Sequence, residues 1–165
     1  MTDSKRIEEL VKQTIENLRS SKYADIDDMS LELAQRISKQ VRQKAEEMGM
    51  KIVVAISNKA ARCVLVECMD DAYIASYDVA VNKAFTVVSL KMDTVTLKPL
   101  AQPGESLYGI QFTNEGKIVI FGGGCVLKVG DKVIGGIGVS GGSEEQDTFL
   151  SQYGKEVFER EISKL

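Results

Sequence analysis

The C-terminal third of the chain contains the stretch FGGGCVLKVGDKVIGGIGVSGGSEEQD, residues 121–147, in which glycine recurs every few positions. Within it, GIGVSG at residues 136–141 fits G-x-G-x-x-G, the loop that binds the pyrophosphate of a dinucleotide. That loop needs a following helix and then a parallel strand that ends in an acidic residue. Here the remaining residues have the pattern of one helix, whose first turn carries Glu144, Glu145 and Asp147. These carboxylates would repel a pyrophosphate, so we expect no NAD or NADP binding.

Two interpretations of the glycines remain open. Glycine adopts positive φ angles, occupies bulges and lets another backbone approach closely. Alternatively, the triple glycine Gly122, Gly123 and Gly124 leaves main-chain N–H groups uncovered, where they admit a flat ligand or a neighbouring subunit. The triplet does not begin a Walker A loop, because no Lys-Ser or Lys-Thr pair follows it.

The absence of histidine among the 165 residues excludes many kinds of site. It removes Ser-His-Asp and Cys-His catalysis, H-E-x-x-H zinc sites and histidine ligation of haem. The three cysteines form no C-x-x-C pair and are expected to be reduced thiols. The net charge of −3 argues against nucleic-acid binding. With no apolar signal core and no apolar run of membrane-spanning length, the chain is expected to be a single cytoplasmic domain, residues 1–165, without a membrane partner.

Apolar periodicity divides the chain into helices and strands. The helical pattern covers residues 5–20, 29–48, 72–90 and 143–165, with Asp28 as N-cap of the second helix and Gly49 after its end. The β pattern covers residues 51–57, 62–69, 117–121, 126–129 and 132–139, and residues 92–109 are expected to form a loop. Because most strands are joined as hairpins, this order predicts an α/β (α+β) fold. Helices should cover both faces of a five-stranded antiparallel sheet, with residues 51–57 in a central strand.

A series of short motifs occurs along the chain in a fixed order. These are Met69-Asp70-x-Ala72, Ala80-x-x-Lys83-Ala84-x-Thr86, Leu107-Tyr108-Gly109, Phe121-Gly-Gly-Gly124, Val133-x-Gly135-x-Ile137-Gly-Val-Ser-Gly-Gly142 and Gln146-Asp147. The series resembles the GlcG / PduO C-terminal family, often labelled haem-degrading-like or HbpS-like, over residues 30–159. Residues 1–25 would then form an extra N-terminal helix before the family domain.

The resemblance implies a profilin-like three-layer α/β/α sandwich with a five-stranded antiparallel sheet, in agreement with the order of elements. It also implies homo-oligomers, from dimers up to octamers. Members accompany bacterial glycolate, diol and glycerol utilisation, and some bind haem or are linked to corrinoid metabolism. The chain departs from the family pattern at the first hairpin turn, Ser57-Asn58-Lys59-Ala60. It departs again at Cys68, which replaces an arginine able to clamp an anion.

Lys83 and Thr86 are the first candidates for a ligand site. Lys83 lies on a mostly apolar helix, where burial could lower its pKa or its charge could bind a propionate. The other interpretations are a surface lysine that extends its charged end into solvent, or an ion-pair partner of Asp78 or Asp70. Thr86 follows one helical turn later and could donate a hydrogen bond to the same ligand.

Tyr108 and Cys125 are the remaining side-chain candidates. Tyr108 could ligate haem iron as a phenolate, or seal a loop against the core. Cys125 could be a thiolate ligand if it is exposed near the glycine N–H groups, or a small buried hydrophobe. Asp147 is expected to cap a helix rather than to act as an acid or base.

Three functions follow from these candidates. The first is a cytoplasmic accessory protein that binds haem or a corrinoid through Lys83, Thr86, Tyr108, Cys125 and the triple glycine. The second is an assembly or chaperone-like subunit without a ligand. The third is an enzyme acting on a small oxygenated metabolite, with Lys83 as base or electrophile and glycine N–H groups as oxyanion donors. The missing histidines and the missing arginine favour the first two, and no catalytic residue is assigned.

Overall fold

A computed structural model of the chain describes residues 6–14 and 26–164. Its sheet contains β1 (Val53–Asn58), β2 (Cys63–Cys68), β3 (Gly124–Val129) and β4 (Lys132–Ser140), all paired antiparallel in the order β2-β1-β4-β3. The strand predicted to be central, β1, lies between β2 and β4. The two predicted hairpins are therefore confirmed, and the β1–β4 pairing joins them into one sheet.

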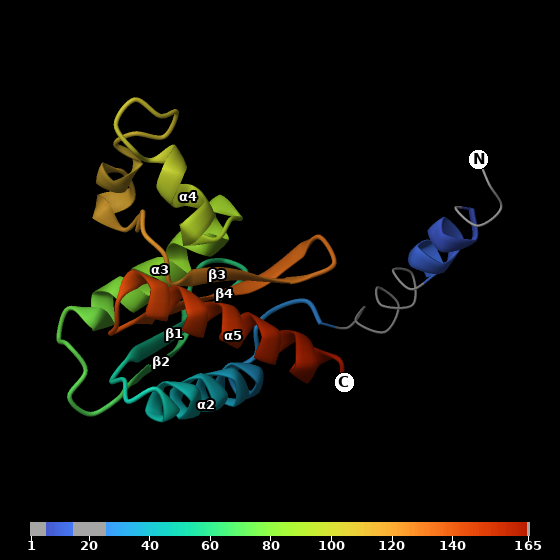
Figure 1. Cartoon of the computed structure of the whole chain (residues 1–165), viewed down its shortest axis with the longest axis horizontal. Helices are drawn as coiled ribbons and strands as arrows, with labels where there is room; N and C mark the ends of the chain where they lie inside the picture. Colours follow the sequence, from blue (N-terminus) through green and yellow to red (C-terminus); the bar gives the residue numbers. More distant parts are fainter. Residues whose placement is uncertain (1–5, 15–25, 165) are drawn as a thin grey trace.

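Helices cover both faces of this sheet, so the predicted three-layer α/β/α arrangement is confirmed (Figure 1). The helices α2 (Leu31–Glu47) and α5 (Glu144–Ile162) lie side by side on one face. The helix α3 (Ser76–Leu90) covers the other face. The short helix α4 (Thr94–Leu100) and the two 3-10 turns that follow, Ile110–Phe112 and Asn114–Gly116, form a lobe beyond the end of the sheet (Figure 1).

The period-2 pattern of β1 supplies both halves of the core. Val54 and Ile56 point into the cluster formed with α2 and α5, whereas Val53 and Ala55 point into the cluster formed with α3. All four side chains are almost completely buried. A strand that is buried on both faces needs a nearly continuous apolar sequence, and β1 has one.

The prediction of five strands was wrong, because residues 117–121 form no strand in the described structure. Their backbone is bound by a side chain of α3 in place of a neighbouring strand. The N–H of Val119 donates to Thr86 Oγ1 at 3.0 Å, and Thr86 Oγ1 also lies 3.3 Å from the carbonyl oxygen of Lys117. Ile118 and Val119 are nevertheless buried, which explains why this segment has the apolar character of a strand.

Several predicted element ends also shift. Helix α2 is capped by Ser30, whose side chain accepts from the N–H of Leu33, and not by Asp28. Asp28 instead accepts hydrogen bonds from the N–H groups of Met29 and Lys59. Helix α3 begins at residue 76 and not at residue 72, and α4 lies inside the predicted loop. Residues 6–14 are helical as predicted, and the rest of the predicted helix 5–20 lies outside the described residues.

The glycines of the G-x-G-x-x-G match let α3 pack closely on β4. A Cβ atom on Gly138 would lie 2.1 Å from the carbonyl oxygen of Ala80, and one on Gly136 would lie 2.5 Å from Val87 Cγ2. Neither distance is possible for a real side chain. These two glycines therefore serve the close approach of a helix to a strand. The helix α5 follows this strand, and no parallel strand comes after it in the described chain.

The described helices include none that is both long enough and apolar enough to cross a membrane.

Candidate functional site

The side chain of Lys83 crosses from α3 to the beginning of α5 without any exposed surface. Its Nζ donates to Asp147 Oδ2 at 2.9 Å and to the carbonyl oxygen of Val139 at 2.8 Å. The ring of Phe121 covers the ammonium group at 5.0 Å from the ring centroid, which is within cation–π range. Lys83 is therefore a buried cation whose partner is Asp147, and neither Asp70 nor Asp78.

Burial shifts both members of this ion pair in the direction of neutrality. Loss of solvation lowers the pKa of Lys83, and the attraction of Asp147 opposes that change. Loss of solvation likewise raises the pKa of Asp147, against the attraction of Lys83 and the hydrogen bond from the N–H of Gly142. Asp147 therefore supports a turn and a cation, and does not cap α5. The cap of α5 is Ser143, which forms a capping box with Gln146.

The triple glycine makes room for this ion pair. A Cβ atom on Gly123 would lie 2.4 Å from Lys83 Nζ, and the φ angle of Gly123 is +111°. The neighbouring N–H groups already have partners: Gly122 donates to Glu144 Oε1 and Gly124 donates to Thr94 Oγ1, each at 2.9 Å. These N–H groups are thus occupied by the protein itself, which weakens their interpretation as oxyanion donors.

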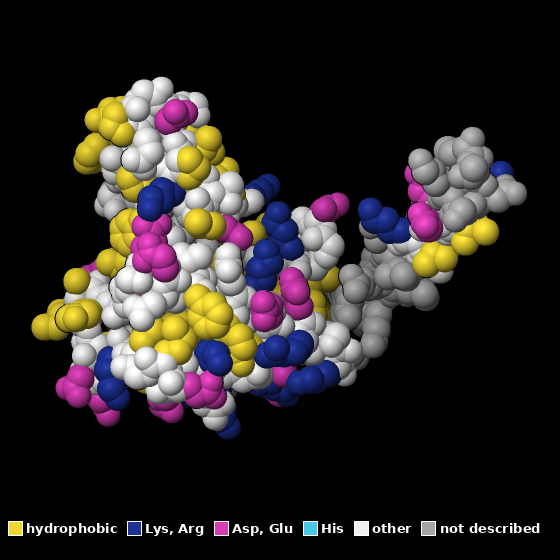
Figure 2. All heavy atoms as spheres, viewed as in Figure 1, with side chains coloured by type: hydrophobic (Ala, Val, Ile, Leu, Met, Phe, Trp, Pro, Cys, Tyr) yellow, Lys and Arg dark blue, Asp and Glu magenta, His cyan; other side chains and the backbone are white. Residues whose placement is uncertain are grey.

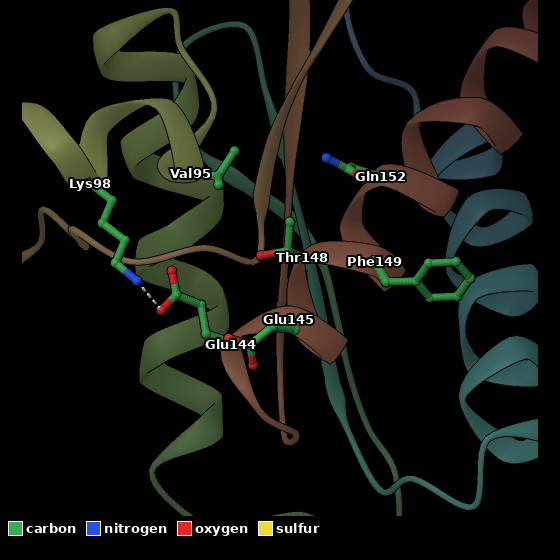
Figure 3. Close-up of a pocket in the computed structure, with 7 residues that line it drawn as sticks. All are labelled: Val95, Lys98, Glu144, Glu145, Thr148, Phe149 and Gln152. Carbon is green, nitrogen blue, oxygen red and sulfur yellow. Dashed lines mark hydrogen bonds and ion pairs between the residues drawn. The ribbon is translucent and has the colours of Figure 1, made fainter.

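An open cleft of about 330 Å³ lies beside the triple glycine, between α4 and α5 (Figure 3). Lys98 of α4 faces Glu144 of α5 across it, with Nζ 2.6 Å from Oε2. The hydrogen bond from Lys98, followed by that from the N–H of Gly122, lowers the pKa of Glu144. Val95 points into the space between the helices, whereas the ring of Phe149 points away from α4 (Figure 3). Glu144 thus joins the cleft to the glycine segment.

The four predicted side chains occupy different surroundings. Lys83 lies at the triple glycine. Thr86 is buried, and its hydroxyl donates to the carbonyl oxygen of Asn82 at 2.7 Å and accepts from Val119. Tyr108 is 62% exposed in the lobe that follows α4. The structure therefore brings Lys83 and the glycines together and does not place Tyr108 in contact with them.

Cys125 points into the core on the α5 side of the sheet. It is 1% exposed, and its Sγ lies 3.4 Å from Ser151 Oγ. Burial raises the pKa of this thiol to about 12, so it stays protonated at neutral pH. Because the thiolate interpretation required exposure, the structure supports the alternative of a small buried hydrophobe.

Sequence reasoning missed Asp147 as the partner of Lys83, and it missed the Lys98–Glu144 pair. Both pairs join residues far apart in the sequence, and no local spacing connects them. Within the described residues, no group of three or more His, Cys, Asp or Glu side chains could hold a metal ion. The arrangement therefore offers a buried structural ion pair next to an exposed cleft that carries one cation and two carboxylates.

Residues 29–155 match the family described as haem degrading protein HbpS-like. The chain belongs to this HbpS-like family. A relative is an uncharacterized 15.0 kDa protein encoded between dhaT and dhaS in Citrobacter freundii. It is 38% identical over 138 residues, which cover 84% of this chain and 97% of the relative. The resemblance expected from the motifs is confirmed.

Two further relatives carry names that mention a corrinoid or haem. The corrinoid adenosyltransferase PduO of Salmonella typhimurium is 38% identical over 110 residues, which cover 67% of this chain and 33% of PduO. The crystal structure of the PduOC:heme complex superimposes with a TM-score of 0.76 at 33% identity, covering 79% of this chain and 94% of that one. The match thus covers a third of PduO, and almost all of the chain crystallised with haem.

Proposed function

We propose that this chain is a tetrapyrrole-binding accessory protein, with haem as the first ligand to test and a corrinoid as the second. The observation that carries the proposal is the likeness to the PduOC:heme complex, at 33% identity and a TM-score of 0.76. The match to part of a corrinoid adenosyltransferase is the reason to include a corrinoid. No adenosyltransferase activity follows, because the match covers only 33% of that protein.

In this proposal the tetrapyrrole is held mainly by apolar contact and by a cation that binds a propionate. Haem would supply an iron that binds small ligands and changes oxidation state. The chain has no histidine, so no imidazole can ligate the iron. The Cys125 thiol is buried and protonated, so it cannot serve as a thiolate ligand either. Tyr108 is the exposed oxygen donor among the candidates, and Lys98 is an exposed cation that is joined to the glycine segment through Glu144.

Lys83 no longer serves as the cation for a propionate in this proposal. Its ammonium group has no exposed surface, and its hydrogen bonds go to Asp147 and Val139. The same burial weakens an enzyme that uses Lys83 as base or electrophile, because a substrate would have to displace Phe121 to reach it. In this proposal Lys83 has a structural role: its buried ion pair with Asp147 stabilises the fold next to Gly123.

The test is a titration of the purified protein with hemin and, in parallel, with cyanocobalamin, followed by absorbance. We expect saturable hemin binding with a high-spin ferric spectrum, because no pair of imidazoles is available. Lys98→Met should weaken binding about tenfold, the effect of one charge-assisted hydrogen bond, and Tyr108→Phe should change the spectrum if the phenol is the axial ligand. Lys128→Met removes an exposed cation on β3 and is the matched control.

If neither tetrapyrrole binds saturably at micromolar concentration, the accessory-binder proposal fails. The assembly or chaperone-like subunit then becomes the better interpretation. Exposed apolar side chains support that alternative: Ile74 is 96% exposed, Phe112 80% and Tyr73 74%. Hydrophobic side chains also gather on the lobe beyond the sheet (Figure 2).

We also propose that the protein is a cytoplasmic homo-oligomer, between a dimer and an octamer, in a bacterial glycolate, diol or glycerol pathway. Tyr73 and Ile74 are consecutive and largely exposed, and contiguous exposed apolar surface is typical of sites that bind another protein. Sedimentation equilibrium at micromolar concentration should give a mass well above that of one chain. A monomer under these conditions would rule out the oligomer and leave the exposed apolar residues to another partner.

A further inference from the structure

A second cleft, of about 190 Å³, lies at the turn of the first hairpin, between β1–β2 and α3. Its volume equals that of about six water molecules, so it suits a molecule of a few carbon atoms. The lining includes Arg62 and Cys63 from the hairpin, Asn82 and Phe85 from α3, and Lys117 from the segment after the lobe. None of these residues belongs to the Lys98 cleft or to the Lys83 ion pair.

The charge of this cleft is positive, and its strongest donor is free. Within residues 6–14 and 26–164, the guanidinium group of Arg62 makes no ion pair and no hydrogen bond. The side-chain amide of Asn82 is likewise without a hydrogen bond to the described chain. Lys117 binds Glu115 at 2.9 Å, but Glu115 does not line the cleft, and neither does any other carboxylate.

The hairpin turn fixes the backbone from which Arg62 extends. The Oδ1 atom of Asn58 accepts hydrogen bonds from the N–H groups of Ala60 and Arg62, both at 3.0 Å. The N–H of Asn58 in turn donates to the carbonyl oxygen of Arg62 at 2.9 Å. Ala61 between them has a positive φ of 56°, a strained conformation that these bonds maintain. The guanidinium group is thus attached to a rigid turn.

The rest of the cleft wall is apolar. Val81, Ala84 and Phe85 of α3 and Ala61 of the turn also line it. A site that combines a free guanidinium group with a small apolar wall matches a carboxylate attached to a short hydrocarbon chain. Arginine binds a carboxylate through two parallel N–H···O bonds, which gives both strength and direction.

We propose that this cleft binds a small aliphatic monocarboxylate, with Arg62 as the bidentate donor, Asn82 as a second donor and Phe85 against the hydrocarbon chain. The site is separate from the tetrapyrrole site proposed above, so either proposal can fail without the other.

The two exposed cysteines of β2 provide the test. Cys63 lines the cleft, whereas Cys68 lies at the other end of the same strand. The native protein is alkylated with iodoacetamide in the presence of butyrate, and each cysteine peptide is quantified by mass spectrometry. Saturating butyrate should slow alkylation of Cys63 severalfold and leave Cys68 unchanged, and n-butanol should protect neither.

Arg62→Gln should weaken the apparent affinity for butyrate about tenfold to a hundredfold, whereas Lys128→Gln should not change it. The side chain of Arg62 makes no hydrogen bond or ion pair with the described chain, and its backbone bonds to Asn58 do not depend on the guanidinium group, so this variant should fold normally. Equal protection by butanol, or unchanged protection in Arg62→Gln, would overturn the carboxylate site. So would protection by hemin but not by butyrate, which would assign the carboxylate to a tetrapyrrole propionate.

Discussion

Replacing Lys83 by Met removes one charge of the buried ion pair while keeping most of the hydrocarbon stem. Lys83 is 0% exposed and Asp147 is 4% exposed, so solvent cannot take over the lost interaction. The variant leaves the carboxylate of Asp147 buried without its cation and leaves the carbonyl oxygen of Val139 without its donor. Breaking a buried pair in this way typically destabilises a protein by about 3–5 kcal/mol.

In the variant, Asp147 can take up a proton instead of staying charged without a partner. The free energy of that protonation is therefore the most that the unpaired charge can cost. From its ordinary pKa of 3.8, protonating an aspartate at pH 7 costs about 4 kcal/mol, at 1.36 kcal/mol for each pH unit. At pH 5 the same step costs only about 1.6 kcal/mol. In the variant the pKa of Asp147 is raised in the folded state, so the folded state binds more protons than the unfolded state. The stability of Lys83→Met relative to wild type should therefore increase as the pH falls from 7 to 5.

The assay is urea unfolding of wild type and variant at pH 7 and pH 5. With a slope of about 2 kcal/mol per molar, a loss of 3–5 kcal/mol lowers the urea midpoint by about 1.5–2.5 M at pH 7. Lys98→Met breaks the pair with Glu144, whose lysine is 47% exposed, and should cost less than about 1 kcal/mol. If the two variants unfold at the same midpoint, or if the loss in Lys83→Met grows at pH 5, the ion pair is not desolvated and the reasoning is refuted.

Three further predictions concern other parts of the structure. With an aromatic disulfide reagent, Cys63 and Cys68 should react in the native protein and Cys125 only after unfolding, since its pKa is raised to about 12; three fast thiols in the native state would contradict its burial. Gly138→Ala should destabilise the protein by about 1–3 kcal/mol or more in thermal or urea unfolding, because its Cβ would lie 2.1 Å from the carbonyl oxygen of Ala80. The hydrogen bonds and charges of Lys132 and Lys59 lower the pKa of Asp27 to about 2, so its stabilising contribution should be present above pH 4 and lost between about pH 4 and pH 2. NMR titration of that carboxylate gives the value directly, and a midpoint near 3.8 would show that these pairs do not form in solution.

The sequence predicted those parts of the fold that depend on local periodicity. The helix α2, both hairpins, the central place of β1 and the helix α5 all follow from apolar spacing, and Gly49 ends α2 with a φ of +69° as expected. The missing fifth strand has a different cause. Residues 117–121 are apolar because Ile118 and Val119 are buried, but Thr86 of α3 binds their backbone. Periodicity reports burial, and it does not report which group satisfies the backbone.

The candidate site was predicted only in part for a similar reason. The sequence identified Lys83 and the triple glycine, and the structure brings them together. It could not identify Asp147 as the partner, because that contact joins residues that are 64 positions apart. Nor could it show that the glycine N–H groups are occupied by Glu144 and Thr94. Such contacts depend on how α3, α4 and α5 meet at the end of the sheet.

The ion pair and the triple glycine therefore act as one structural unit. Lys83 extends from the layer of α3 to Asp147 in the layer of α5, and it passes the segment just before β3, where Gly123 has no side chain to block it. The same carboxylate holds the N–H of Gly142, so the pair also fixes the turn from which α5 begins. Most residues that line the cleft between α4 and α5 belong to α5. Loss of Lys83 should therefore disturb this cleft even though Lys83 itself would not contact a ligand bound there. A variant at Lys83 that binds hemin poorly is thus evidence about folding, whereas Lys98→Met, on the exposed side of the same cleft, tests recognition itself.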